Sequence, residues 1–196
     1  GHTGCMPAFG ANLVGAFPPE TVNPGDVFIC NDPWLCNGQT ADIFITTPAF
    51  HKGKLIGFSV NTIHHVDIGG RKGSGLSEEV FEEGLIIPML RLYDAGEPNE
   101  MLFDLIRRNV RYSEKMIGDL RAQVATGWAG CRELERLCAE FDFPDLREVS
   151  DEITGRTEEG IRAGLRELPD GEWREEMMMD IDCLLYTSPS PRDTMS

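Results

Sequence analysis

The spacing of hydrophobic residues changes along this chain and divides it into a region with strand periodicity and a region with helix periodicity. Before residue 98, the apolar segments are short and rich in Val, Ile, Phe and Thr, as is typical of strands. Three such segments predict strands: 27–32, 42–50 and 54–63. The sequence His-Lys-Gly-Lys predicts a hairpin turn between the last two. A short helix with Pro7 in its first turn is predicted over 7–17.

Beyond residue 98, apolar residues recur every three or four positions, which is the period of an amphipathic helix. Asn99 and Ser113 are expected to cap the first two helices. The second helix is long, because its apolar positions continue to about Phe141. A third helix is predicted over 144–168.

These patterns predict an α+β fold for residues 1–182. A β-rich region with irregular glycine-rich loops covers about 1–97, a helical region covers 98–168, and a terminal strand is expected over 171–182. The last segment, 183–196, departs from the pattern and resembles the read-through of a sequencing adapter, so we expect a non-native tail. Because the first residues read as the interior of a protein, we expect an internal fragment of a longer domain.

Composition and charge narrow the classes of partner. Hydrophobic residues make up 41% of the chain and charged residues 26%, which is a globular composition. No apolar segment approaches the ~20 residues of a membrane helix, so no membrane is expected. The formal net charge of −15 argues against nucleic acid as a partner. The six cysteines form no Cys-x-x-Cys pair, so we expect reduced thiols and a cytoplasmic protein.

Polar residues able to bind metal or transfer protons gather around one predicted hairpin. Asp42 opens its first strand and His64 closes its second, so antiparallel pairing makes them neighbours at one edge of the sheet. Four loop residues are expected at the same edge: Asp32, Gln39, His65 and Asp67. Oxygen and nitrogen ligands of this kind suit a divalent ion such as Mn, Fe or Zn. The alternative is structural, with an aspartate that forms a turn and histidines that end a strand.

Two other chemistries have weaker support in the sequence. No G-x-S-x-G segment is present, Ser59 has no evident orienting group, and Cys30 and Cys36 are the remaining candidate nucleophiles. The glycine-rich segment Gly-Gly-Arg-Lys-Gly-Ser-Gly, residues 69–75, lacks the spacing of a phosphate-binding loop. A mobile loop that covers a small-molecule substrate is the better interpretation of this segment.

Five segments, in order along the chain, together resemble one protein family. They are GDVFICNDPW, ADIFITTPAF, LIGFSVNTIHHVDIGG, VFEEGLIIPMLRLYDAGEPNEMLFDLIRRNVR and GDLRAQVAT. The family is that of hydantoinase B and 5-oxoprolinase. It includes the B-type component of N-methylhydantoinase, the C-terminal part of 5-oxoprolinase, and the large subunits of acetone and acetophenone carboxylases. The resemblance extends from about residue 2 to residue 182.

The resemblance implies a division of labour between two proteins. A hydantoinase A-type partner binds ATP and activates the substrate, while the B-type part hydrolyses a cyclic amide or joins an enolate to activated carboxylate. In the family's metal-containing carboxylases, a His-x-x-Asp pair and the first histidine of a His-His pair hold the ion. The matching positions here are Gln39, Asp42 and His64. Glutamine at position 39 departs from the pattern and is a weaker, neutral ligand.

We therefore expect a subunit of an ATP-dependent cyclic amide hydrolase that opens a hydantoin or 5-oxoproline ring. A divalent metal is the expected cofactor, and ATP is expected to be used by the partner subunit. His65, Asp67 and Asp32 are the expected catalytic residues, which would orient ligands or move protons. Two alternatives stay open: the large subunit of an ATP-dependent ketone carboxylase, and an assembly scaffold that has no activity alone.

Overall fold

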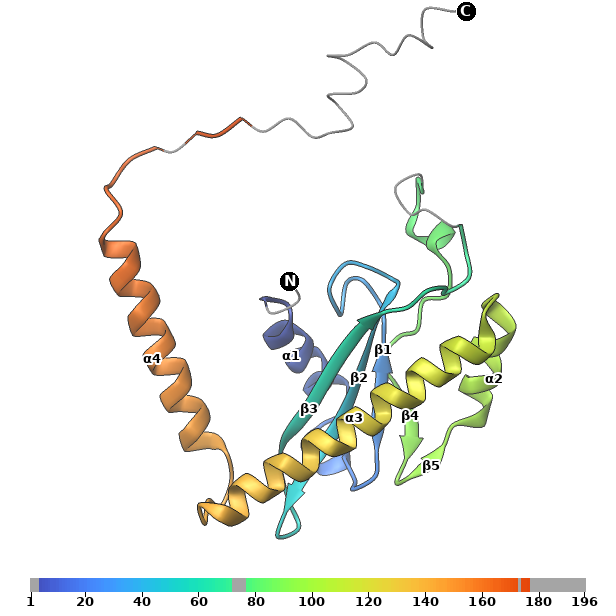
Figure 1. Ribbon diagram of the computed structural model, residues 1–196, viewed down its shortest axis with the longest axis horizontal. Helices are drawn as coiled ribbons and strands as arrows, with labels where there is room; N and C mark the ends of the chain where they lie inside the picture. Colours follow the sequence, from blue (N-terminus) through green and yellow to red (C-terminus); the bar gives the residue numbers. More distant parts are fainter. Residues whose placement is uncertain (1–3, 72–76, 173, 177–196) are drawn as a thin grey trace, which may run out of the picture. The chain divides into compact units, whose positions relative to one another are not determined.

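The computed structural model describes residues 4–71, 77–172 and 174–176 and forms two compact units, residues 1–151 and 152–196 (Figure 1). The first unit contains an antiparallel sheet with helices on both faces, which confirms the predicted α+β class. Its strands lie in the order β3-β2-β1-β4-β5. Their bounds are Val27–Cys30 (β1), Asp42–His51 (β2), Lys54–His64 (β3), Leu90–Asp94 (β4) and Glu97–Pro98 (β5).

The β2–β3 hairpin is the longest pairing of the sheet, and it forms where the sequence predicts it. Lys52 and Gly53 both adopt positive φ angles, 49° and 79°, which two-residue hairpin turns of the primed type require. From this turn the register continues to the far end of the hairpin, where Asp42 pairs with His64. The predicted antiparallel neighbours are therefore confirmed.

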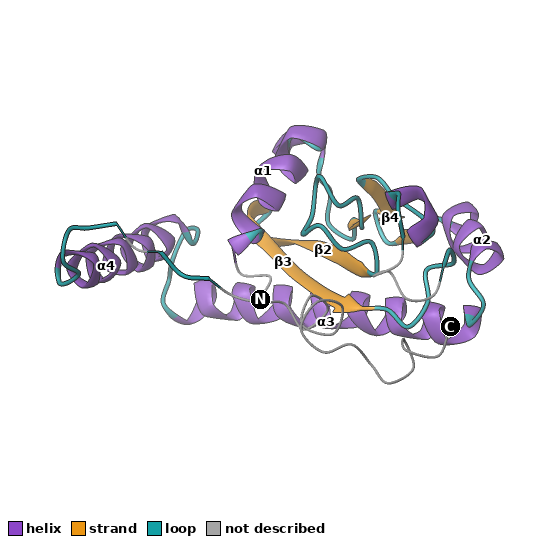
Figure 2. Ribbon diagram, turned by 90° about the horizontal axis from the view of Figure 1, so that it is seen from above, coloured by secondary structure: helices purple, strands orange, loops and turns teal. Residues whose placement is uncertain are grey.

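Alternation along the strands places one apolar cluster on each face of the sheet. Helix α1 (Met6–Ala16) covers one face, and helices α2 (Glu100–Asn109) and α3 (Ser113–Glu140) cover the other (Figure 2). The α1 face includes Phe28, Cys30 and Phe44 from the sheet with Phe9 and Leu13 from the helix. The opposite face includes Val27, Ile29, Ile43 and Ile45 with Leu120 and Val124 of α3. The long amphipathic helix predicted from Ser113 thus packs as expected.

The two predicted caps have different outcomes. The Asn99 side chain accepts a hydrogen bond from the Leu102 amide, 3.2 Å away, so it caps α2 as predicted. Ser113 is instead the first residue of α3, and the cap position belongs to Tyr112 without a side-chain hydrogen bond. The prediction for Ser113 is wrong because the Asp67 carboxylate accepts the backbone amides at this entry to the helix.

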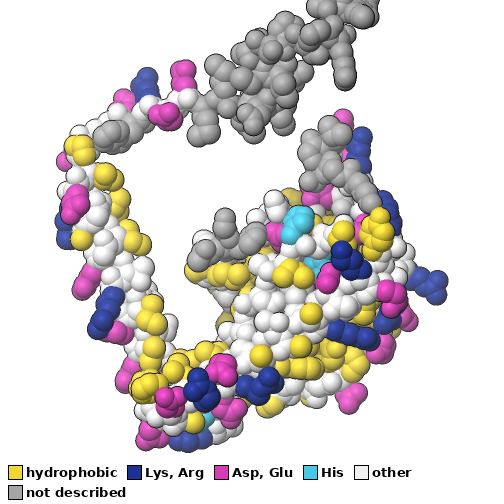
Figure 3. Space-filling model, viewed as in Figure 1, with side chains coloured by type: hydrophobic (Ala, Val, Ile, Leu, Met, Phe, Trp, Pro, Cys, Tyr) yellow, Lys and Arg dark blue, Asp and Glu magenta, His cyan; other side chains and the backbone are white. Residues whose placement is uncertain are grey.

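Helix α4 (Arg147–Arg166) forms within the predicted range, and it has no buried residue. Its apolar side includes Ile153, Ile161 and Leu165, each exposed by about 60%. Apolar side chains are visible along this helix in Figure 3. The period of a sequence therefore predicted the helix without giving a partner for its apolar side.

Several other elements complete the described residues. Strands β4 and β5 were not predicted, and two 3-10 turns, η2 (Pro19–Thr21) and η4 (Val80–Glu83), interrupt the loops. Most of the terminal strand predicted over 171–182 lies outside the described residues, and its described part forms no strand. None of the helices in the described parts of the chain has the length and apolar character needed to span a membrane.

Candidate functional site

Asp42 and His64 form the centre of the candidate site. The Nδ1 atom of His64 lies 2.7 Å from Oδ1 of Asp42, and the other carboxylate oxygen accepts from Nδ2 of Asn37 at 2.5 Å. Asp42 is buried, whereas the His64 side chain is about two-thirds exposed, at 67%. Because a carboxylate only accepts hydrogen bonds, His64 donates through Nδ1. Its Nε2 is then the nitrogen left to accept a proton or to bind a ligand.

His65 is the buried member of the histidine pair. Only 2% of its surface is exposed, and its Nε2 lies 2.9 Å from Oε1 of Gln123 on α3. Burial lowers the pKa of His65 and outweighs the bond to Gln123, which acts in the opposite direction. The imidazole is therefore neutral at neutral pH. Its Nδ1 is buried and has no hydrogen-bond partner among the described residues.

Asp67 fixes the loop after β3 to the start of α3. Its carboxylate accepts from the amides of Arg111, Tyr112 and Gly69 and pairs with the Arg111 guanidinium at 2.8 Å. Burial by itself raises the pKa of Asp67, but the donors from Arg111 and Gly69 prevail and hold that pKa below its usual range. A carboxylate held in this state is suited to anchoring the loop rather than to carrying protons.

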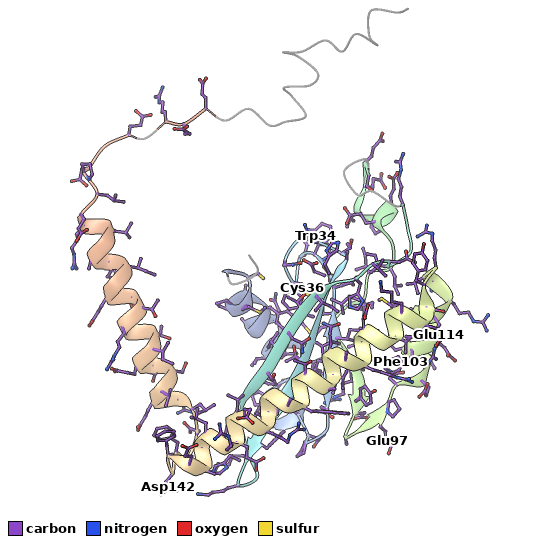
Figure 4. All side chains as sticks on the ribbon, in the orientation of Figure 1. Trp34, Cys36, Glu97, Phe103, Glu114 and Asp142 are labelled. Carbon is purple, nitrogen blue, oxygen red and sulfur yellow. The ribbon has the colours of Figure 1, made fainter. Side chains whose placement is uncertain are left out.

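Asp32 and Gln39 lie on the loop between β1 and β2, which also carries Trp34 and Cys36 (Figure 4). The Asp32 carboxylate accepts from the Trp34 amide at 2.9 Å, an aspartate turn, and Asp32 does not line the pocket described below. Gln39 lines that pocket and is exposed. The structure thus brings together five of the six predicted residues and places Asp32 apart from them.

A pocket of about 380 Å³ opens beside the Asp42–His64 pair. Its lining includes His64, His65 and Asp67 together with Gln39, Thr40, Arg71 and Glu83. Thr40 donates to Glu83 at 2.6 Å, and Arg71 pairs with the neighbouring Glu82 at 3.3 Å. This volume is within the range of small-molecule sites, about 300–1,000 Å³. The polar lining and the adjacent imidazole suit a small polar substrate.

The cysteines considered as nucleophiles do not line this pocket. Cys30 and Cys36 are buried in the apolar cluster under α1, and both are free thiols. A hydrogen bond between the two thiols lowers the pKa of Cys30 and raises the pKa of Cys36. Their position argues for packing rather than for attack on a substrate.

A metal ion would find two strong ligands here. Asp42 and His64 supply a carboxylate and an imidazole within 2.7 Å of each other. No group of three or more His, Cys, Asp or Glu suitable for a metal occurs within the described residues. The third ligand of the predicted set is the amide oxygen of Gln39, which binds divalent cations more weakly than a histidine or carboxylate.

Two residues of the site escaped the sequence analysis. Asn37 holds the second oxygen of Asp42, and Gln123 holds His65. Gln123 carried a usable signal, since it is a polar residue between Leu120 and Val124 on the buried side of α3. Asn37 carried none, because asparagine is common in loops of this kind.

Comparisons with known proteins place this geometry in context. A sequence model described as Hydantoinase B/oxoprolinase matches residues 1–189. The B-type component of a putative D-/L-hydantoinase from Pseudomonas sp. (strain NS671) is 32% identical over 82% of this chain and 28% of the relative. The beta chain of caprolactamase from Pseudomonas jessenii is 32% identical over 81% of this chain and 28% of the relative. This chain thus spans less than a third of these relatives.

Two solved structures resemble the fold. The crystal structure of ATP-dependent caprolactamase from Pseudomonas jessenii matches with a TM-score of 0.76 and 32% identity, covering 85% of this chain and 29% of that one. An acetone carboxylase in a nucleotide-free structure matches with a TM-score of 0.59 and 25% identity, covering 70% of this chain and 18% of that one. The two relatives differ in the reaction that their names describe.

Proposed function

Because this chain belongs to the hydantoinase B/oxoprolinase family, we propose that it forms part of the reaction centre of an ATP-dependent cyclic amide hydrolase. The observation that carries the proposal is the hydrogen-bonded Asp42–His64 pair beside a polar pocket. Relatives named hydantoinase, caprolactamase and 5-oxoprolinase support the reaction class. The partner is a hydantoinase A-type ATP-binding protein, which agrees with the names of two relatives as single components of larger enzymes.

The mechanism assigns separate tasks to the two residues of the pair. Asp42 accepts the Nδ1 proton of His64 and so fixes the ring with Nε2 as the free base. Nε2 removes a proton from water as the water oxygen attacks the amide carbonyl carbon. The buried carboxylate stabilises the imidazolium that forms. When the ring C–N bond breaks, His64 returns this proton to the departing nitrogen.

The residues that would hold a divalent ion are Asp42, His64 and Gln39. The donor set fits a weakly bound cation, because two of its three members are ordinary ligands of Mn, Fe or Zn. When bound, such an ion supplies polarisation of a substrate carbonyl. The proton transfer assigned to His64 depends on the protein's own hydrogen bond to Asp42.

A ketone carboxylase is the second candidate, favoured by the likeness of this fold to acetone carboxylase. The likeness is weaker in TM-score and identity than that to caprolactamase. Bicarbonate distinguishes the candidates, because only carboxylation consumes it. Ring opening in its absence supports the hydrolase, and bicarbonate-dependent ATP turnover supports the carboxylase.

The test compares substitutions at the two ends of the β2–β3 hairpin in the full-length protein with its ATP-binding partner. His64→Ala and Asp42→Asn should lower the rate of ring opening by about 10²–10⁴-fold, the range of general acid–base catalysis. Lys54→Ala is the control, since Lys54 is exposed and lies at the turn end of the hairpin. Circular dichroism checks the fold of each variant. Full activity in His64→Ala would contradict the proposal.

A further inference from the structure

Gln123 is a buried polar residue on a helix face that is otherwise apolar. It lies on α3 between Leu120 and Val124, and 3% of its surface is exposed. A buried amide is costly unless its hydrogen bonds are made. Each polar atom of this side chain has a partner, as the contacts with Ile43, Asn61 and His65 show.

Two backbone carbonyls fix the orientation of this amide. Nε2 of Gln123 lies 2.9 Å from the carbonyl oxygen of Ile43, which can only accept a hydrogen bond. Asn61 is fixed in the same way, because its Nδ2 donates to the backbone carbonyl of Gln123 at 3.0 Å. Its Oδ1 therefore accepts from Gln123 Nε2 at 3.0 Å. The amide cannot be reversed without losing these bonds, so Oε1 faces His65.

This orientation determines which nitrogen of His65 carries the proton. Oε1 accepts only, so the 2.9 Å contact requires a proton on Nε2 of the imidazole. In the neutral ring, Nδ1 then carries the lone pair. Nδ1 is buried without a partner in the described part of the chain, and His65 lines the pocket. An unpaired buried acceptor in a pocket wall indicates a ligand that donates a hydrogen bond.

We propose that Gln123 is a positioning residue that holds His65 as the Nε2–H tautomer, so that Nδ1 accepts the ring N–H of a cyclic amide bound in the pocket. The identity of the donor rests on the proposed function, whereas the tautomer follows from the hydrogen bonds alone. Asp42–His64 supplies the proton chemistry, and Gln123–His65 recognises the unsubstituted ring nitrogen. The site would thus select secondary cyclic amides over tertiary ones.

The first test measures the tautomer directly. Full-length protein labelled with ¹⁵N-histidine should show the His65 signal with Nε2 protonated and Nδ1 unprotonated, because the two nitrogen states have separate chemical shifts. Gln123→Met keeps the side-chain length and removes the acceptor, so it should lose this pattern. Arg121→Met, at an exposed position of the same helix, should keep it. A wild-type spectrum with the proton on Nδ1 overturns the proposal, whether or not the variants fold.

The second test measures the ligand contact, with ε-caprolactam and N-methyl-ε-caprolactam as the probes. The wild type should prefer the unsubstituted ring by about two- to tenfold in kcat/KM, the range of one neutral hydrogen bond. Gln123→Met should lose this preference, whereas a structural role alone would lower turnover of both probes equally. An unchanged preference overturns the ligand assignment. Absence of ring opening in the wild type would contradict the proposed function, while the histidine spectrum still decides the role of Gln123.

Discussion

A single methyl group at Gly127 should weaken the packing of α3 against the sheet. Gly127 is buried on the side of the helix that faces β2, and a Cβ built there would overlap the Thr47 hydroxyl. Thr47 is 2% exposed on a central strand, so its side chain has little room to move. Gly118, on the same helix, is exposed and has nothing within 4 Å of an added Cβ. These two glycines form a matched pair.

The expected sizes follow from two opposing effects. Replacing glycine by alanine inside a helix favours folding by about 0.8–1.0 kcal/mol. Inserting a methyl group into a close-packed contact costs about 1–3 kcal/mol. Gly118→Ala should therefore stabilise the protein by about 1 kcal/mol. Gly127→Ala should destabilise it by up to about 2 kcal/mol, since the propensity gain offsets part of the steric cost.

Urea unfolding followed by tryptophan fluorescence measures both changes, since Trp128 lies beside the substituted position and contacts Tyr93 of the sheet at 5.8 Å between ring centroids. Thr47→Ala combined with Gly127→Ala should recover part of the loss, because it removes the hydroxyl that the new methyl group meets. If Gly127→Ala stabilises the protein as much as Gly118→Ala, the close approach of α3 to β2 is refuted.

Two further substitutions test buried carboxylates. The lowered pKa of Asp67 means that its stabilisation is fully present above the ordinary value of 3.8 and is lost as pH falls through the folded-state pKa. Asp67→Asn should therefore reduce the free energy of unfolding at pH 7 and flatten its decline below about pH 4, as measured by urea titrations across this range. Asp26 is fully buried, accepts two backbone amides and pairs with Arg91 at 3.3 Å. Asp26→Ala should cost about 3–5 kcal/mol in the same assay, against less than about 1 kcal/mol for the exposed Asp142→Ala.

The main part of the sheet was predictable because its information is local. A tight turn fixes the register of a hairpin, and the register then places every residue of both strands. The neighbouring positions of Asp42 and His64 follow from the turn at Lys52 and Gly53. The helices after residue 98 were equally accessible, since their period repeats over many turns.

Strands β4 and β5 were missed for the opposite reason. They are short, at five and two residues, and follow an irregular glycine-rich segment. β4 gains its place by pairing with β1, more than 60 residues earlier in the chain. Such pairing depends on the assembled sheet rather than on local pattern. The apolar side of α4 shows a related limit, because periodicity predicts a face without predicting what contacts it.

The same distinction explains why the predicted site residues have different roles. The hairpin register predicts which residues meet, but the role of each depends on partners from distant segments. Asp67 resembled a proton carrier in the sequence until Arg111, 44 residues away, supplied its hydrogen bonds. His65 depends on Gln123, 58 residues away, for its tautomer. His64 alone keeps a nitrogen toward the pocket with a local partner, Asp42, and so the base assigned to the reaction is the one whose geometry the hairpin itself determines.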